Sequence, residues 1–161
     1  MTVTMITVGG DGTFTFCAAH SGLHGGQFEP MHGHSYAVTL RLHGGLDQAR
    51  MVCDFSVVKE ALTAVIAPLR RRTLMPAQPL GGRCARQGGQ VIIECGGKRY
   101  SLPAQDVVLL PVANTPTEAL AAYLLAELML RLDAPALELA ELILAEAPGR
   151  SATAAVRPGG R

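Results

Sequence analysis

The sequence predicts an α+β chain in which strands and helices occupy separate stretches. Residues 13–20 and 34–42 alternate apolar and polar side chains, the period of a strand with one buried face. Residues 57–69 and 115–132 instead repeat apolar side chains every three to four positions, as amphipathic helices do. With 161 residues the chain suits one domain with one core, and we expect that domain to span residues 1–161.

Composition and charge argue against several classes of function. Apolar residues make up 48% and charged residues 17%, which is typical of a globular chain. The net charge of +1 and the absence of Trp argue against nucleic acid as a partner. There is no export signal and no apolar run of roughly 18 residues, so we expect no membrane partner and a cytoplasmic location. The four cysteines have no paired spacing and are expected to be free thiols.

The two N-terminal strands each collect apolar side chains on one face. The face of the first strand carries Phe14, Phe16, Ala18 and His20, and that of the second carries Tyr36, Val38, Leu40 and Leu42. The helix that follows has Asp54 or Ser56 available as its N-cap. The basic run Arg70-Arg71-Arg72 comes where cations suit the C-terminal end of a helix dipole.

Residues 73–113 differ in composition from the segments on either side and are rich in turn-forming residues. Within them, residues 90–102 predict two short strands around Gly96-Gly97. We therefore expect an inserted segment that folds as a hairpin over the sheet edge or over a pocket.

The second helix is predicted to open with a capping box. Thr115 would be the cap, Pro116 the first-turn proline and Glu118 the capping-box glutamate. Residues 136–147 are ambiguous, because Ala, Leu and Glu favour a helix on propensity alone. Residues 151–156 predict a last strand.

Three histidines form the main chemical hypothesis. His32 and His34 differ by two positions, so in a strand both point to the face that carries Tyr36. His20 shares the apolar face of its own strand. If the two strands pair antiparallel, the three imidazoles meet, which is the ligand set of a catalytic zinc site with an open fourth position. The alternative is that the His-x-His pair is an ordinary core or surface pair.

Five segments of the chain follow one another in a recognisable order: "FCAAH", "MHGHSYAVTLRLHG", "MVCDFSVVKEAL", "NTPTEALAAYLL" and "ELILAEA". They resemble the 6-pyruvoyltetrahydropterin synthase and 6-carboxytetrahydropterin synthase family. The resemblance implies the tunnelling fold, a four-stranded antiparallel sheet with two helices on one face in the order ββααββ. Residues 137–146 would then be a strand despite their helix propensity. It also implies trimers that stack in pairs into hexamers, with sites between subunits.

The resemblance also assigns roles to individual residues. The implied zinc ligands are His20, His32 and His34. Glu146 matches the glutamate that grips the pterin ring, whose paired N–H donors a carboxylate accepts in a fork. Thr115 and Thr117 lie near the threonines that line the pterin pocket. The alternatives are an exposed strand glutamate for Glu146 and simple helix capping for Thr115.

The residues that transfer protons in this family are replaced here. Phe28 stands at the position of the catalytic cysteine, and Arg70-Arg71 stand at the Asp-His pair. Neither Phe nor Arg changes protonation near neutral pH. We therefore expect a pterin-binding homologue that does not catalyse the family reaction.

The alternative is a zinc-dependent enzyme that acts on dihydroneopterin triphosphate or a related pterin by another step. Glu29 would be its acid or base, since a variant branch of the family has a glutamate in place of the cysteine. In an extended segment Phe28 and Glu29 point to opposite faces. Arg70 and Arg71 would bind a substrate phosphate, or else form a solvated helix end.

Overall fold

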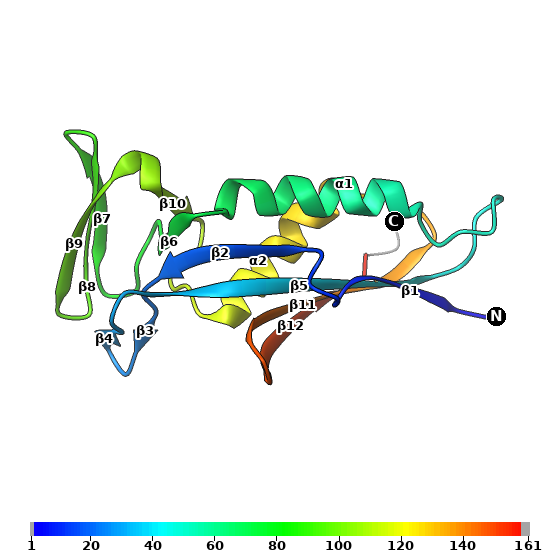
Figure 1. Cartoon of the computed structure of the whole chain (residues 1–161), viewed down its shortest axis with the longest axis horizontal. Coiled ribbons are helices and arrows are strands. Elements are labelled where there is room, and N and C mark those ends of the chain that lie inside the picture. Colours follow the sequence, from blue (N-terminus) through cyan, green and yellow to red (C-terminus); the bar gives the residue numbers. More distant parts are fainter. Residues whose placement is uncertain (1, 159–161) are drawn as a thin grey trace.

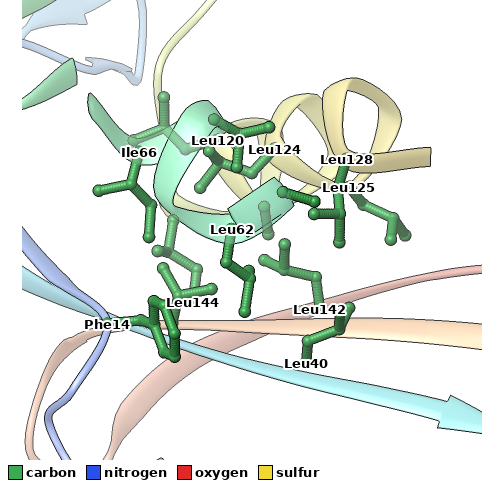
Figure 2. Close-up of a cluster of buried hydrophobic side chains, with 14 of the residues drawn as sticks. Phe14, Leu40, Leu62, Ile66, Leu120, Leu124, Leu125, Leu128, Leu142 and Leu144 are labelled. Carbon is green, nitrogen blue, oxygen red and sulfur yellow. The ribbon is translucent and has the colours of Figure 1, made fainter. Parts of the chain in front are cut away.

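The structure is a computed structural model that describes residues 2–158; Met1 and residues 159–161 of the expected domain lie outside this range. Within it, α1 (Phe55–Ile66) and α2 (Thr117–Met129) lie on one face of a large sheet (Figures 1 and 2). The strands of that sheet are β1 (Thr4–Gly9), β2 (Thr15–His20), β5 (His32–Gly44), β6 (Arg72–Pro76), β10 (Val107–Leu110), β11 (Leu137–Ala147) and β12 (Arg150–Val156). The short 3-10 turns are Ala67–Leu69 and Ala104–Asp106.

The sheet is wider than predicted and mixed in direction. Its order is β10-β6-β2-β5-β11-β12, with β1 paired to β5, which makes seven strands in the described part of the chain. β2, β5, β11 and β12 are antiparallel, so the predicted centre and the order ββααββ are present. The prediction of four antiparallel strands is wrong at the edges. There β6 runs parallel to β2, and β10 parallel to β6, so the edge of β2 is covered by strands of the 73–113 segment.

The remainder of the 73–113 segment forms a separate sheet at one end of the molecule (left in Figure 1). Its antiparallel strands are β7 (Arg83–Gln87), β8 (Gln90–Cys95) and β9 (Lys98–Pro103). The predicted strands on either side of Gly96-Gly97 are confirmed as β8 and β9. The prediction of a simple hairpin is incomplete because β7 is exposed and polar, with no apolar alternation to reveal it.

The main core lies between the helices and the sheet. Leu62 of α1 and Leu124 of α2 pack towards Leu40, Leu142 and Leu144 of the strands (Figure 2). Helix α1 begins as predicted, with the Asp54 carboxylate accepting a hydrogen bond of 2.7 Å from the Ser56 amide. No helix among the residues described is long and apolar enough to cross a membrane.

The ambiguous stretch forms strand β11, as the resemblance implied. Its backbone pairs with β5 on one side and β12 on the other. Alternate side chains, Ala140, Leu142 and Leu144, are buried beneath the helices. Two-sided pairing and burial of one face therefore override the helix propensity of its Ala, Leu and Glu residues.

Candidate functional site

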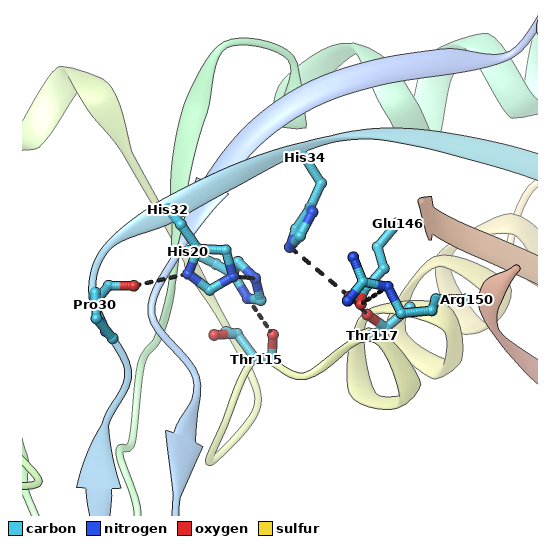
Figure 3. A network of polar contacts seen from close by, with 8 residues as sticks. All are labelled: His20, Pro30, His32, His34, Thr115, Thr117, Glu146 and Arg150. Carbon is cyan, nitrogen blue, oxygen red and sulfur yellow. Dashed lines mark hydrogen bonds and ion pairs between the residues drawn. The ribbon is translucent and has the colours of Figure 1, made fainter. Parts of the chain in front are cut away.

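The three predicted histidines converge at the end of β2 and the beginning of β5. His20 and His32 are direct partners in the antiparallel register. One ring nitrogen from each of His20, His32 and His34 lies within 4.8 Å of the others (Figure 3). The strand parity of the sequence thus predicts the meeting of the side chains correctly.

Hydrogen bonds on the far side of two rings fix the chemistry of this cluster. The Nδ1 atom of His20 lies 2.8 Å from the Thr115 carbonyl oxygen, and that of His32 lies 2.7 Å from the Pro30 carbonyl oxygen. Because a carbonyl oxygen only accepts, each Nδ1 carries the proton, and each Nε2 of a neutral ring presents a lone pair. The two Nε2 atoms are 3.2 Å apart. Facing lone pairs at this distance repel unless a cation lies between them, so the donor set fits a metal such as zinc.

The protonation of His20 favours the same chemistry. Burial lowers the pKa of His20 below its ordinary value, and the neighbouring His32 and His34 lower it further, whereas its hydrogen bond to Thr115 works in the opposite direction. The ring is therefore held neutral near physiological pH, which is the form that binds a metal ion.

Glu146, near the end of β11, faces the histidines in a polar network. Its Oε2 atom lies 3.9 Å from Nε2 of His34, and its Oε1 atom lies 3.7 Å from Nε of Arg150 (Figure 3). The Thr117 hydroxyl donates a hydrogen bond to the same carboxylate. This hydrogen bond lowers the pKa of Glu146 more than partial burial raises it, so the carboxylate is ionised at neutral pH.

The start of α2 differs from the predicted capping box. The helix begins at Thr117 with Pro116 at the N-cap, and no side-chain cap hydrogen bond is found in the described residues. Thr117 instead donates to Glu146, a charged acceptor that forms the stronger bond. Thr115 orients His20 through its carbonyl. The capping role predicted for Thr115 is therefore wrong; Thr117 lines the cavity, whereas Thr115 is buried outside the cavity lining and contacts the site only through its carbonyl.

The site has a cavity with a volume of about 620 Å³. Its lining includes His20, His32, His34, Glu29, Thr117, Glu118, Glu146 and Arg150. Glu29 thus lines the same cavity as the histidines. Phe28, at the position of the family's cysteine, is 3% exposed and packs into a second apolar cluster. The opposite directions of residues 28 and 29 agree with strand parity.

Arg70 and Arg71 lie elsewhere in the described chain. Both are exposed, and neither lines the histidine cavity. The Arg71 amide donates a 2.7 Å hydrogen bond to the Cys17 carbonyl oxygen, and Arg71 lines a different cavity with Cys17 and Ser35. Sequence reasoning missed Arg150, although the Pro148-Gly149 turn signal would have brought Arg150 back towards Glu146.

The phenol group of Tyr36 is a second unusual feature of the site. Its side chain is fully buried, its ring centroid lies 5.5 Å from that of His34, and the hydroxyl has no partner among the described residues. Burial raises the pKa of Tyr36, so the group stays protonated. A buried polar group without a partner costs stability that its removal recovers.

Replacing Tyr36 by phenylalanine should therefore raise the free energy of unfolding of the metal-free protein by about 1 kcal/mol. Chemical denaturation of Tyr36→Phe measures this, with Tyr123→Phe on the half-buried face of α2 as the control, for which we expect little change. A loss of stability in Tyr36→Phe would mean that the hydroxyl has a partner, such as an ordered water molecule.

Comparison with known proteins gives a consistent result. The sequence model of the family 6-pyruvoyl tetrahydropterin synthase matches residues 11–156. A Methanocaldococcus jannaschii protein, provisionally named 6-carboxy-5,6,7,8-tetrahydropterin synthase, is 31% identical over 103 residues, which are 63% of each chain. The match thus spans less than two thirds of that relative's length.

Solved structures agree over nearly the whole chain. The 6-pyruvoyl tetrahydropterin synthase of Plasmodium vivax has a TM-score of 0.90 and 28% identity, and the match covers 98% of this chain and 99% of that one. A variant of the P. vivax protein, in which a glutamate described as a catalytic residue is changed to alanine, has the same TM-score and coverage at 27% identity. The match of the family model to residues 11–156, together with this fold, shows that the chain belongs to the 6-pyruvoyl tetrahydropterin synthase family.

Proposed function

We propose that the histidine cavity binds zinc and a pterin-like molecule, and that Glu29 transfers protons to and from the pterin side chain. The observation that carries this proposal is the position of Glu29, which lines the same cavity as the three histidines while Phe28 does not. The P. vivax relative with a catalytic glutamate supports it further. This is the second of the two functions that the sequence left open, and the place of Glu29 in the cavity lining supports it.

Each group at the site has a role in this proposal. Glu146 would accept hydrogen bonds from the paired N–H donors of the pterin ring, and the hydrogen bond from Thr117 keeps its carboxylate ionised. A volume of about 620 Å³ suits a small bicyclic ligand with a side chain. Zinc on His20, His32 and His34 would supply a Lewis acid that polarises an oxygen of the side chain. The Glu29 carboxylate would accept a proton from the side chain and return it at a later step.

The other candidate is a pterin-binding protein without turnover. It is favoured by Arg70 and Arg71, which replace the Asp-His pair with groups that do not exchange protons. Incubation of the purified, zinc-loaded protein with dihydroneopterin triphosphate, followed by chromatography of the pterin products, separates the two candidates. New products support the enzyme, and unchanged substrate supports the binding protein.

The proposal also covers the oligomeric state of the protein and its location in the cell. We propose a homo-oligomer, a hexamer of two stacked trimers, that acts in the cytoplasm. Arg71 lines a second cavity of its own chain, which His34 also lines, so a phosphate-binding role for Arg71 would be exerted there or at the site of a neighbouring subunit.

The ring-binding role of Glu146 predicts a large loss of affinity in one variant. Glu146→Ala should weaken pterin binding by about 100-fold or more, because it removes a forked, charge-assisted pair of hydrogen bonds. Titration of the protein against pterin fluorescence measures this. Glu138→Ala, at the other end of β11, is the matched control and should bind as the unaltered protein does. Undiminished affinity in Glu146→Ala would refute the assignment of the pocket.

A further inference from the structure

We propose that the 73–113 segment positions Glu29, acting through Phe28 and the turn at Gly96. The inference rests on the proposed function of Glu29, and it gives the 73–113 segment the role of holding Glu29 in place. The residues concerned are positioning residues, since they hold the backbone of the acid or base rather than the substrate. Two sets of contacts with the 73–113 segment support this, and a third set, made by Asn114 and Gly22 outside that segment, holds the rest of the hairpin in place.

The first set is an apolar anchor. The Phe28 side chain is buried in a cluster formed almost entirely by the 73–113 segment, with Met75, Val91, Ile93, Cys95 and Val107 as its other buried members. The ring centroids of Phe28 and Tyr100 lie 6.2 Å apart. Consecutive residues of an extended chain point in opposite directions. Burial of Phe28 in this cluster therefore leaves Glu29 on the side of the histidine cavity, which it lines.

The second set joins two backbones directly. The Phe28 amide donates a 3.3 Å hydrogen bond to the carbonyl oxygen of Gly96, in the turn between β8 and β9. A Cβ atom on Gly96 would lie 2.3 Å from the Phe28 nitrogen, so only glycine allows this approach. The adjacent Gly97 also has a positive φ, yet a Cβ atom there would meet nothing within 4 Å. The two glycines thus lie in the same turn, but only Gly96 packs against the backbone of Phe28.

The third set of contacts fixes the other strand of the hairpin that carries Phe28. The Asn114 side chain bonds both backbone polar groups of Leu23, accepting from the Leu23 amide at 2.7 Å and donating to the Leu23 carbonyl oxygen at 3.0 Å. The hairpin of β3 (Leu23–His24) and β4 (Gln27–Phe28) is therefore tethered on both strands. At its base, the Glu29 amide donates to the Gly22 carbonyl oxygen at 2.9 Å.

The two glycines supply a matched experiment. Gly96→Ala should accelerate amide hydrogen exchange at Phe28 and Glu29 by about tenfold or more, because the added Cβ displaces the backbone of the hairpin. It should also lower kcat about tenfold or more, because misplaced catalytic groups lose rate steeply. Zinc content and the KM for the pterin should stay unchanged, because the proposed zinc ligands lie on β2 and β5 and the pterin-binding Glu146 lies on β11. Gly97→Ala carries a similar turn strain and should leave exchange at Phe28 and Glu29, and kcat, unchanged.

The possible results separate the two ideas. Unchanged exchange at Phe28 in Gly96→Ala would overturn the anchoring. Faster exchange with an unchanged kcat would overturn the positioning role. Absence of turnover in the unaltered protein would overturn the catalytic role of Glu29 itself, and the exchange measurement would still decide the anchoring. If Gly96→Ala does not fold, Phe28→Leu shortens the apolar anchor instead and should show the same loss of kcat at constant KM.

Discussion

Replacing His20 by alanine should abolish stoichiometric zinc binding. The residue supplies one of three ring nitrogens that meet within 4.8 Å, and its ring is already fixed in orientation by the Thr115 carbonyl. Loss of a partner outside the ligand set of a zinc site costs up to about 100-fold in affinity, so loss of a ligand should cost at least as much. Metal analysis after dialysis against zinc-free buffer measures the remaining content.

The control for this measurement is His24→Ala. His24 is exposed on β3 and is not part of the cluster, so its replacement should leave zinc content unchanged. Thermal stability gives an independent readout. Zinc at about 100 times its Kd should add about 2.7 kcal/mol to the free energy of unfolding of the unaltered protein and little to that of His20→Ala. Equal zinc content in His20→Ala and the unaltered protein would place the metal at another site.

Strong local patterns allowed strands β2 and β5, both helices and the meeting of the three histidines to be predicted, whereas strand β11 was predicted from the family resemblance. The long alternation of β5 fixes which face is buried, and parity then places His32 and His34 together. The edges of the sheet were not predictable in this way. β6 and β10 are short, and they pair in parallel across a large separation along the chain, which no local period reports.

The orientation of Glu29 shows the limit of reasoning from a single segment. Parity indicates that Phe28 and Glu29 point in opposite directions, but not which of them faces the cavity. That choice is made by the apolar cluster of the 73–113 segment, which takes up Phe28. Likewise, the hydrogen bond from Thr117 to Glu146 depends on the return of β11 to the start of α2. Both outcomes are set by contacts between residues distant in sequence.

Glu29→Gln should lower kcat by about 1,000-fold, within the range that a positioned acid or base contributes. Glutamine has nearly the same shape but cannot exchange a proton at neutral pH. Zinc content and pterin affinity should therefore hold, because His20, His32, His34 and Glu146 are untouched. Steady-state kinetics with dihydroneopterin triphosphate, together with pterin titration, measures the two effects separately.

A second substitution tests whether a proton-transferring side chain at position 28 can replace Glu29. Adding Phe28→Cys to Glu29→Gln restores the residue type that the family has at position 28, yet it should not restore turnover. Side chain 28 faces the second apolar cluster, so a thiol there would lie away from the histidine cavity and in surroundings that favour its uncharged form. Recovery of activity in the double variant would show that position 28 reaches the substrate. If Glu29→Gln alone turns over as fast as the unaltered protein, the carboxylate has no part in the chemistry, and proton transfer must then be sought at another group of the cavity.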